Sequence, residues 1–226
     1  MDSAPDAIAV AWPATPDDPH RTTLRGIPDL IAFSVAVPAG VALALHAATT
    51  LGAVTSAVFA VGLVVMLGTS GVYHTFRWGP ERRDLLARLD YSGIYLLIAA
   101  SYTPFCLSTD LHLGPQLLAL VWSFALLGIY CCLFKPHGSR ALRASLYVLL
   151  GVAMVPRIPA LWAVVPGWVF WLSAVGGASY ALGAVIYVVR WPNPIPRHFG
   201  HHEVFHLFVF AGAITHYVAV WQIVGA

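Results

Sequence analysis

Charged residues are scarce in this sequence. Only 10% of the 226 residues are Asp, Glu, Lys or Arg, whereas 59% are hydrophobic. Because a water-soluble domain carries roughly 25% charged residues, this composition excludes an ordinary soluble protein. The net charge of +2 is uninformative by itself, and no nucleic-acid partner is expected.

Cysteine is also rare, and a cleavable signal peptide is not expected. Cys106, Cys131 and Cys132 match no metal-ligand spacing, and the adjacent pair is a poor candidate for an ordinary disulfide, so we interpret all three as packing residues. The N-terminal residues are polar and rich in proline, with no basic segment followed by an apolar one. Residues 1–28 are therefore predicted to form a disordered, polar cytoplasmic tail.

Long apolar runs, in contrast, recur along the chain. A membrane-spanning helix needs about 20 mostly apolar residues, and seven segments meet this requirement. They cover residues 30–49, 51–76, 89–108, 114–134, 141–158, 167–189 and 202–224. Pro156 and Pro159 cut the fifth segment short. The sequence thus predicts an all-α membrane protein with a seven-transmembrane helix bundle at residues 29–226, multi-pass in the cell membrane.

The distribution of basic residues sets the expected orientation. Of the 12 Lys and Arg residues, Arg157 alone lies on one set of loops, and the others lie on the opposite set and in the tail. Since cytoplasmic loops carry the excess of basic residues, the N-terminus is predicted to be cytoplasmic and the C-terminus outside. The second helix then ends, and the third and seventh begin, in the cytoplasmic leaflet.

This orientation brings five polar residues to one depth: Ser70, His74, Asp90, His202 and His206. His202 and His206 are four residues apart, so on a helix they share one face about 6 Å apart. With His74 as third ligand they predict a Zn²⁺ site, since a catalytic zinc typically has three protein ligands and an open position. The alternative is that these residues are interfacial or hydrogen-bond between helices.

Two further side chains give this site a possible chemistry. Ser70 precedes His74 by one helical turn, so its hydroxyl could reach the ion, a bound water or a substrate oxygen. Asp90 could orient a ligand imidazole or accept a proton as general base. Three histidines and a carboxylate with an activated water are the components of a hydrolase.

Residues 202–206 also match the zinc-protease pattern H-E-x-x-H, with Glu203 as base. The extended form of that pattern has a third His where this chain has Gly212, so the protease interpretation is disfavoured. Alternatively, Glu203 is an interfacial residue, or it accepts a hydrogen bond from one of the histidines that would bind the metal. His216 lies about 15 Å along the helix from His206, too far to share one ion.

Three motifs resemble the hemolysin III family, part of the progestin and adipoQ receptor superfamily. They are SGVYH at 70–74, DYSGIYLLI at 90–98 with SYTPF at 101–105, and FGHHEVFHLF at 199–208. The resemblance implies a seven-helix bundle inverted relative to G-protein-coupled receptors. It also implies a zinc held by His74, His202 and His206, with Ser70 and Asp90 nearby. One departure is Tyr91, where many relatives have His.

The resemblance implies a zinc-dependent hydrolase of a lipid amide or ester, such as a ceramide-like substrate. Three histidines and a water are equally consistent with a structural zinc in a membrane-lipid sensor or regulator. A cytolytic, pore-forming hemolysin is the third alternative, although no predicted helix has the charged face of a water-filled pore. In the first two cases a membrane lipid is the expected partner, as substrate or as ligand.

Overall fold

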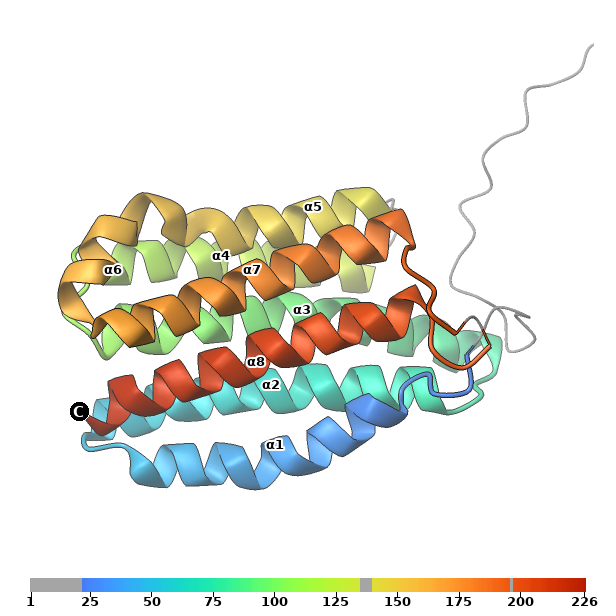
Figure 1. Ribbon diagram of the computed structural model, residues 1–226, viewed down its shortest axis with the longest axis horizontal. Helices are drawn as coiled ribbons and strands as arrows, with labels where there is room; N and C mark the ends of the chain where they lie inside the picture. The colour runs from blue at the N-terminus through green and yellow to red at the C-terminus, as the bar shows by residue number, and fades with distance from the viewer. Residues whose placement is uncertain (1–21, 135–139, 196) are drawn as a thin grey trace, which may run out of the picture.

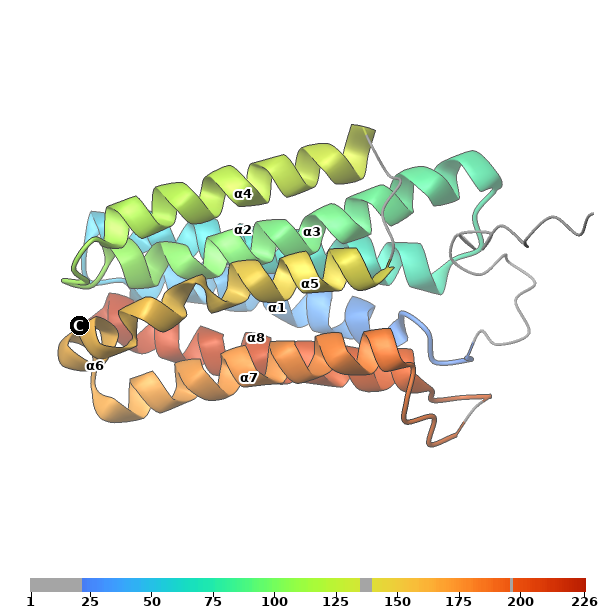
Figure 2. The same cartoon turned by 90° about the horizontal axis from the view of Figure 1, so that it is seen from above.

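The computed structural model describes residues 22–134, 140–195 and 197–226, and they form a bundle of roughly parallel and antiparallel helices (Figures 1 and 2). The helices are α1 (Ile27–His46), α2 (Thr50–Thr75), α3 (Pro80–Leu107), α4 (Gly114–Phe134), α5 (Arg140–Gly151), the 3₁₀ helix η1 (Val152–Arg157), α6 (Ile158–Val164), α7 (Gly167–Val189) and α8 (His201–Gly225). Within these residues, the β-structure consists of one isolated bridge between Ile195 and Phe199. The predicted all-helical fold is confirmed.

Among the described residues, six helical segments are long and apolar enough to cross a membrane. They are Ile27–His46, Thr50–Thr75, Gly114–Phe134, Leu142–Val164, Gly167–Val189 and His201–Gly225. Large apolar side chains also face outward from the bundle, among them Leu45 at 81% and Phe134 at 68% exposure. Such surface is costly in water and suits hydrocarbon. The remaining long helix, α3, is the most polar, because its first turns carry Glu81, Arg82 and Arg83.

The predicted helix at 30–49 is Ile27–His46 in the structure, and two other predicted helices differ more strongly in their bounds. The helix expected at 89–108 begins at Pro80, because proline is favourable in the first helical turn and Asp84 pairs with Arg88 one turn later, at 2.6 Å. The segment expected at 141–158 does not end at its prolines. It tightens into η1 around Pro156 and continues as α6 to Val164, since 3₁₀ geometry and a helix start both tolerate proline.

Consecutive helices pack closely in the pairs α1–α2, α2–α3, α3–α4 and α7–α8, and α8 also contacts α1, α2 and α3. Small residues permit these approaches. A Cβ atom placed on Gly62 of α2 would lie 2.6 Å from Cβ of Ala100 on α3, so only glycine fits there. α5 contacts α3 and α7 more sparsely, and a cavity remains between these helices and α8.

The segment before α1 is held against the start of α8. Residues 23–26 form a turn, and Ile27 and Pro28 are the first residues of α1. The backbone N–H of Thr23 donates to the Arg197 carbonyl, at 3.1 Å. The rest of the predicted tail, residues 1–21, lies outside the described residues.

Candidate metal centre

Three helix ends meet at one end of the bundle. α2 ends at Thr75, α3 begins at Pro80, and α8 begins at His201 (Figure 1). We call this the histidine end. α8 begins there because Gly200 is its N-cap residue and the backbone N–H of Gly200 donates to the Glu203 carboxylate, at 2.7 Å. His202 and His206 follow on successive turns and face the last turn of α2.

The structure brings the three predicted histidines together. Nε2 of His202 lies 3.2 Å from Nε2 of His74 and 2.9 Å from Nε2 of His206. The nearest ligand atoms of all three residues lie within 4.8 Å of one another. His206 is 7% exposed, and His74 is partly buried. This group could hold a metal ion.

The arrangement of the three Nε2 atoms suits a shared metal ion better than hydrogen bonds among the three rings. A neutral imidazole Nε2 either donates one proton or accepts one with a single lone pair. Nε2 of His202 can therefore form a hydrogen bond with Nε2 of His74 or with Nε2 of His206, but not with both at once. An ion held between the three Nε2 atoms would satisfy all three nitrogens at once, and imidazole nitrogen is a common ligand for zinc.

Asp29 is a member of the site that the sequence reasoning missed. It is 1% exposed in the first turn of α1, and its Oδ1 lies 2.7 Å from Nδ1 of His206, a charge contact whose angle is not that of a standard hydrogen bond. A carboxylate at this nitrogen favours the tautomer that leaves Nε2 unprotonated and available to a metal. The sequence contained a signal for it: Asp29 is an acidic residue at the start of an apolar helix, at the same predicted depth as the histidines.

Asp90 and Ser70 lie next to the cluster, on the wall of the cavity described below. Oδ2 of Asp90 is 3.7 Å from Nε2 of His74, which is the nitrogen that faces the other histidines. Asp90 therefore lies at the edge of the His74 ring that faces the other two histidines. The hydroxyl of Ser70 is buried next to the Asp90 carboxylate and makes no hydrogen bond of standard geometry to a described residue.

Glu203 points away from the cluster. Its Oε1 accepts from Thr22 Oγ1 and from Arg25 Nε, both at 2.6 Å, and Oε2 accepts from the Gly200 backbone. Glu203 is 4% exposed, and two of its three donors, Thr22 and Arg25, belong to the segment before α1. This geometry assigns Glu203 to holding that segment, and it gives no support to the protease interpretation.

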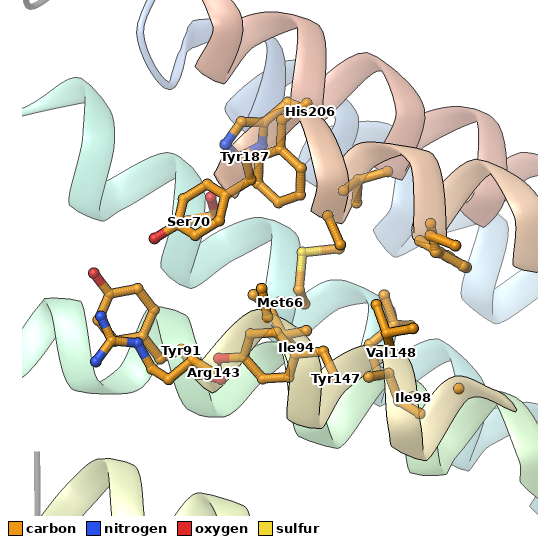
Figure 3. A pocket seen from close by; sticks show the side chains of 18 of the residues that line it. Met66, Ser70, Tyr91, Ile94, Ile98, Arg143, Tyr147, Val148, Tyr187 and His206 are labelled. Atoms are coloured by element: carbon orange, nitrogen blue, oxygen red, sulfur yellow. Dashed lines mark hydrogen bonds between the residues drawn. The ribbon is translucent and has the colours of Figure 1, made fainter. Parts of the chain in front are cut away.

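A cavity of about 1080 Å³ extends from the histidine end into the bundle. Its lining includes Ser70, His74, Asp90, His202 and His206. Figure 3 shows polar side chains gathered at one end of it and apolar side chains farther along: Ser70, Tyr91, Arg143, Tyr187 and His206 at the first, Ile98 and Val148 at the second. The five predicted site residues thus share the wall of one largely apolar chamber.

His216 lies deeper along the same cavity and away from the cluster. Its Nε2 is 3.2 Å from the Ser173 carbonyl, and its ring contacts those of Phe105 and Tyr180. The expectation that His216 stands apart from the three-histidine group agrees with this placement.

These features define a class: a multi-pass helical membrane protein with a histidine cluster and an internal cavity at one end of the bundle. The chain belongs to the haemolysin-III-related family, whose family model matches residues 18–217. The resemblance inferred from the three motifs is therefore confirmed.

The individual relatives span bacteria, plants and animals. The chain is 32% identical over 194 residues to a hemolysin-3 homolog of Bacillus subtilis (strain 168), covering 84% of this chain and 88% of that protein. It is 34% identical over 183 residues to the heptahelical transmembrane protein ADIPOR2 of Oryza sativa subsp. japonica, covering 72% and 79%. It is 32% identical over 179 residues to the adiponectin receptor protein of Drosophila melanogaster, covering 70% of this chain and 40% of that protein.

Proposed function

We propose that this protein is a zinc-dependent hydrolase of a membrane lipid amide or ester. The observation that carries the proposal is the convergence of three imidazole Nε2 atoms, with a carboxylate 3.7 Å from one of them, on the wall of an apolar cavity. In this proposal α3 is the seventh spanning helix, the N-terminus is cytoplasmic, and the histidine end lies in the cytoplasmic leaflet.

His74, His202 and His206 are the residues that would hold zinc. When bound, the ion supplies a Lewis acid that polarises a carbonyl group and acidifies a water molecule. Asp29 holds the His206 ring in the tautomer that binds the ion through Nε2. These four residues provide a fixed frame, because all of them come from helices packed against one another.

Asp90 and Ser70 act on the substrate side of that frame. The Asp90 carboxylate accepts a proton at an oxygen atom from the attacking water and returns it to the leaving amine or alcohol. The Ser70 hydroxyl, which makes no hydrogen bond of standard geometry to a described residue, donates to the carbonyl oxygen of the substrate. Both roles require a substrate carbonyl between α2 and α3.

The cavity supports a lipid as the substrate. Its lining beyond the histidines is mainly apolar, and a chamber of about 1080 Å³ has room for an acyl chain. Such a chamber suits the acyl chain of a lipid, which water carries poorly and the membrane supplies.

The first experiment is the metal content of the purified protein, by elemental mass spectrometry, for the unmodified chain and for His74→Ala and His202→Ala. We expect one zinc per chain in the first and none in the two variants. Arg157→Ala, at the opposite end of the bundle, serves as control and should retain the ion. A folded protein without metal would overturn the hydrolase mechanism.

The second experiment separates turnover from binding. The zinc-loaded protein is incubated with a panel of lipid amides and esters, and fatty-acid release is followed by mass spectrometry. Release that disappears in His202→Ala supports the hydrolase. Zinc binding without release from any member of the panel would support the sensor instead, and zinc-independent leakage of protein-containing vesicles would support a pore.

A further inference from the structure

Three residues form a second polar group on the wall of the cavity, away from the histidine end. They are Ser173 and Tyr180 of α7 and His216 of α8, and all three line the cavity. His216 lies about 15 Å from His206 along α8, so this group sits deep in the bundle. We call it the deep polar group.

The contacts within the deep polar group define what its atoms still lack. Nε2 of His216 is 3.2 Å from the carbonyl oxygen of Ser173. Because a carbonyl only accepts, Nε2 donates, and Nδ1 of the neutral ring is left as an acceptor. Nδ1 is buried and has no hydrogen-bond partner among the described residues, and the same holds for the hydroxyl group of Tyr180. The two rings contact each other, with their centroids 5.4 Å apart. One acceptor and one donor without partners therefore belong to neighbouring rings of the cavity wall.

Helix packing alone does not explain these polar atoms. A Cβ atom on Gly212 of α8 would lie 2.8 Å from the Tyr180 ring, and one on Gly176 of α7 would overlap the His216 ring. The rings thus interlock α7 with α8, but Phe would fill both positions without burying a polar atom. A buried polar atom without a partner is costly, and polar side chains at membrane depth commonly mark a functional site. Two such atoms beside one cavity indicate a ligand that pairs with them.

We propose that the deep polar group binds a hydroxyl group on the chain of the lipid that occupies the cavity. A hydroxyl group both donates and accepts, so it can donate to Nδ1 of His216 and accept from Tyr180, whereas a carbonyl oxygen cannot donate to His216. A few polar groups in an apolar pocket fix the orientation of its ligand. The proposal rests on the proposed function, and it adds a substrate class: a lipid amide or ester whose acyl chain carries a hydroxyl group partway along its length.

The test uses fatty acids, the products that the proposed hydrolysis would release. Ricinoleic acid carries a hydroxyl group partway along its chain, and oleic acid is the same chain without that group. A third probe is the isomer of ricinoleic acid that has its hydroxyl group beside the carboxyl group. Each is titrated calorimetrically into the detergent-solubilised full chain. We expect ricinoleic acid to bind about tenfold more tightly than oleic acid, and the isomer to bind no more tightly than oleic acid.

Two variants remove the polar atoms and keep the rings. Tyr180→Phe and His216→Phe should each reduce the preference for ricinoleic acid about threefold or more, while the affinity for oleic acid stays the same. Tyr180→Phe should also leave the ligand-free unfolding free energy unchanged or higher, since its hydroxyl has no hydrogen bond to a described residue to lose. Tyr217→Phe is the control: Tyr217 follows His216 on α8, donates to the Ala39 carbonyl at 2.9 Å and is not part of the cavity lining, so the preference should remain.

Equal affinity for ricinoleic and oleic acid would overturn the proposal, as would a preference that both Phe variants retain or that the misplaced isomer shares. Zinc content is measured in every sample. Oleic acid that binds to the zinc-loaded protein as tightly as ricinoleic acid does would leave the proposed function standing without the deep polar group. Failure of every fatty acid to bind would remove the lipid from the cavity and both proposals with it, whereas a preference for ricinoleic acid in a protein without zinc would remove the hydrolase mechanism alone.

Discussion

The role of Asp29 can be tested by changing its charge while keeping its shape. Asp29→Asn retains an acceptor oxygen but removes the negative charge 2.7 Å from Nδ1 of His206. Loss of a carboxylate behind a ligand histidine typically weakens metal binding by about 10- to 100-fold. Because Asp29 is 1% exposed, no solvent reaches the carboxylate to replace the lost interaction.

The magnitude follows from linkage between binding and folding. At a zinc concentration of ~100 times the Kd of the unmodified protein, the ion stabilises the fold by about 2.7 kcal/mol. At the same concentration, a tenfold weaker site gains about 1.4 kcal/mol and a hundredfold weaker one about 0.4 kcal/mol. The zinc-dependent gain in unfolding free energy should therefore fall by about 1.3 to 2.3 kcal/mol in Asp29→Asn.

The assay measures thermal or denaturant unfolding in detergent, with zinc and after chelation, so that any effect on the zinc-free fold is subtracted. Asp84→Asn provides the control, since Asp84 pairs with Arg88 on the partly exposed start of α3 and away from the cluster. An exposed pair of this kind contributes about 0–1 kcal/mol, and the zinc-dependent gain should be unchanged. If Asp29→Asn kept the full zinc-dependent gain in unfolding free energy, Asp29 would have no role in zinc binding.

Four other changes have definite expected outcomes. Asp90→Asn should retain zinc, by elemental analysis, while lipid turnover falls about 10²- to 10⁴-fold; loss of the ion would make it a ligand instead. Ser70→Ala should leave the unfolding free energy nearly unchanged, because its hydroxyl has no standard hydrogen bond to lose, while turnover drops. Glu203→Ala should lower the free energy of unfolding, measured with denaturant, by about 3 kcal/mol, because the partly buried guanidinium of Arg25 loses its carboxylate partner. An unchanged free energy of unfolding would show that Glu203 does not hold the segment before α1. Gly62→Ala should lower the free energy of unfolding by about 1–3 kcal/mol, because the added Cβ overpacks the contact between α2 and α3. Gly177→Ala is the control, since a Cβ there meets nothing within 4 Å, and it should not destabilise the protein. Equal free energies of unfolding for the two variants would contradict this prediction.

Much of the architecture depends on short stretches of sequence and could therefore be predicted from them. Apolar runs of membrane-spanning length identified the helices, because hydrocarbon requires every backbone group to be bonded within the segment. The spacing of His202 and His206 placed both on one face of α8, since helical periodicity depends on sequence alone. The prediction that His202 and His206 lie at the same end of the bundle as His74 followed from which predicted helices begin and end on the same side of the membrane.

Other features depended on which helices are neighbours, and spacing along the chain does not contain that information. α1 packs where its first turn meets α8, so Asp29 reaches His206 across 177 positions of sequence, and Glu203 reaches Arg25 across 178. The sparse packing of α5 leaves the cavity, whose lining comes from segments far apart in the sequence. Sequence alone determined the helices and the depth of their polar residues; tertiary packing decided which of those residues touch, because side-chain contacts between helices arise only after the helices are assembled.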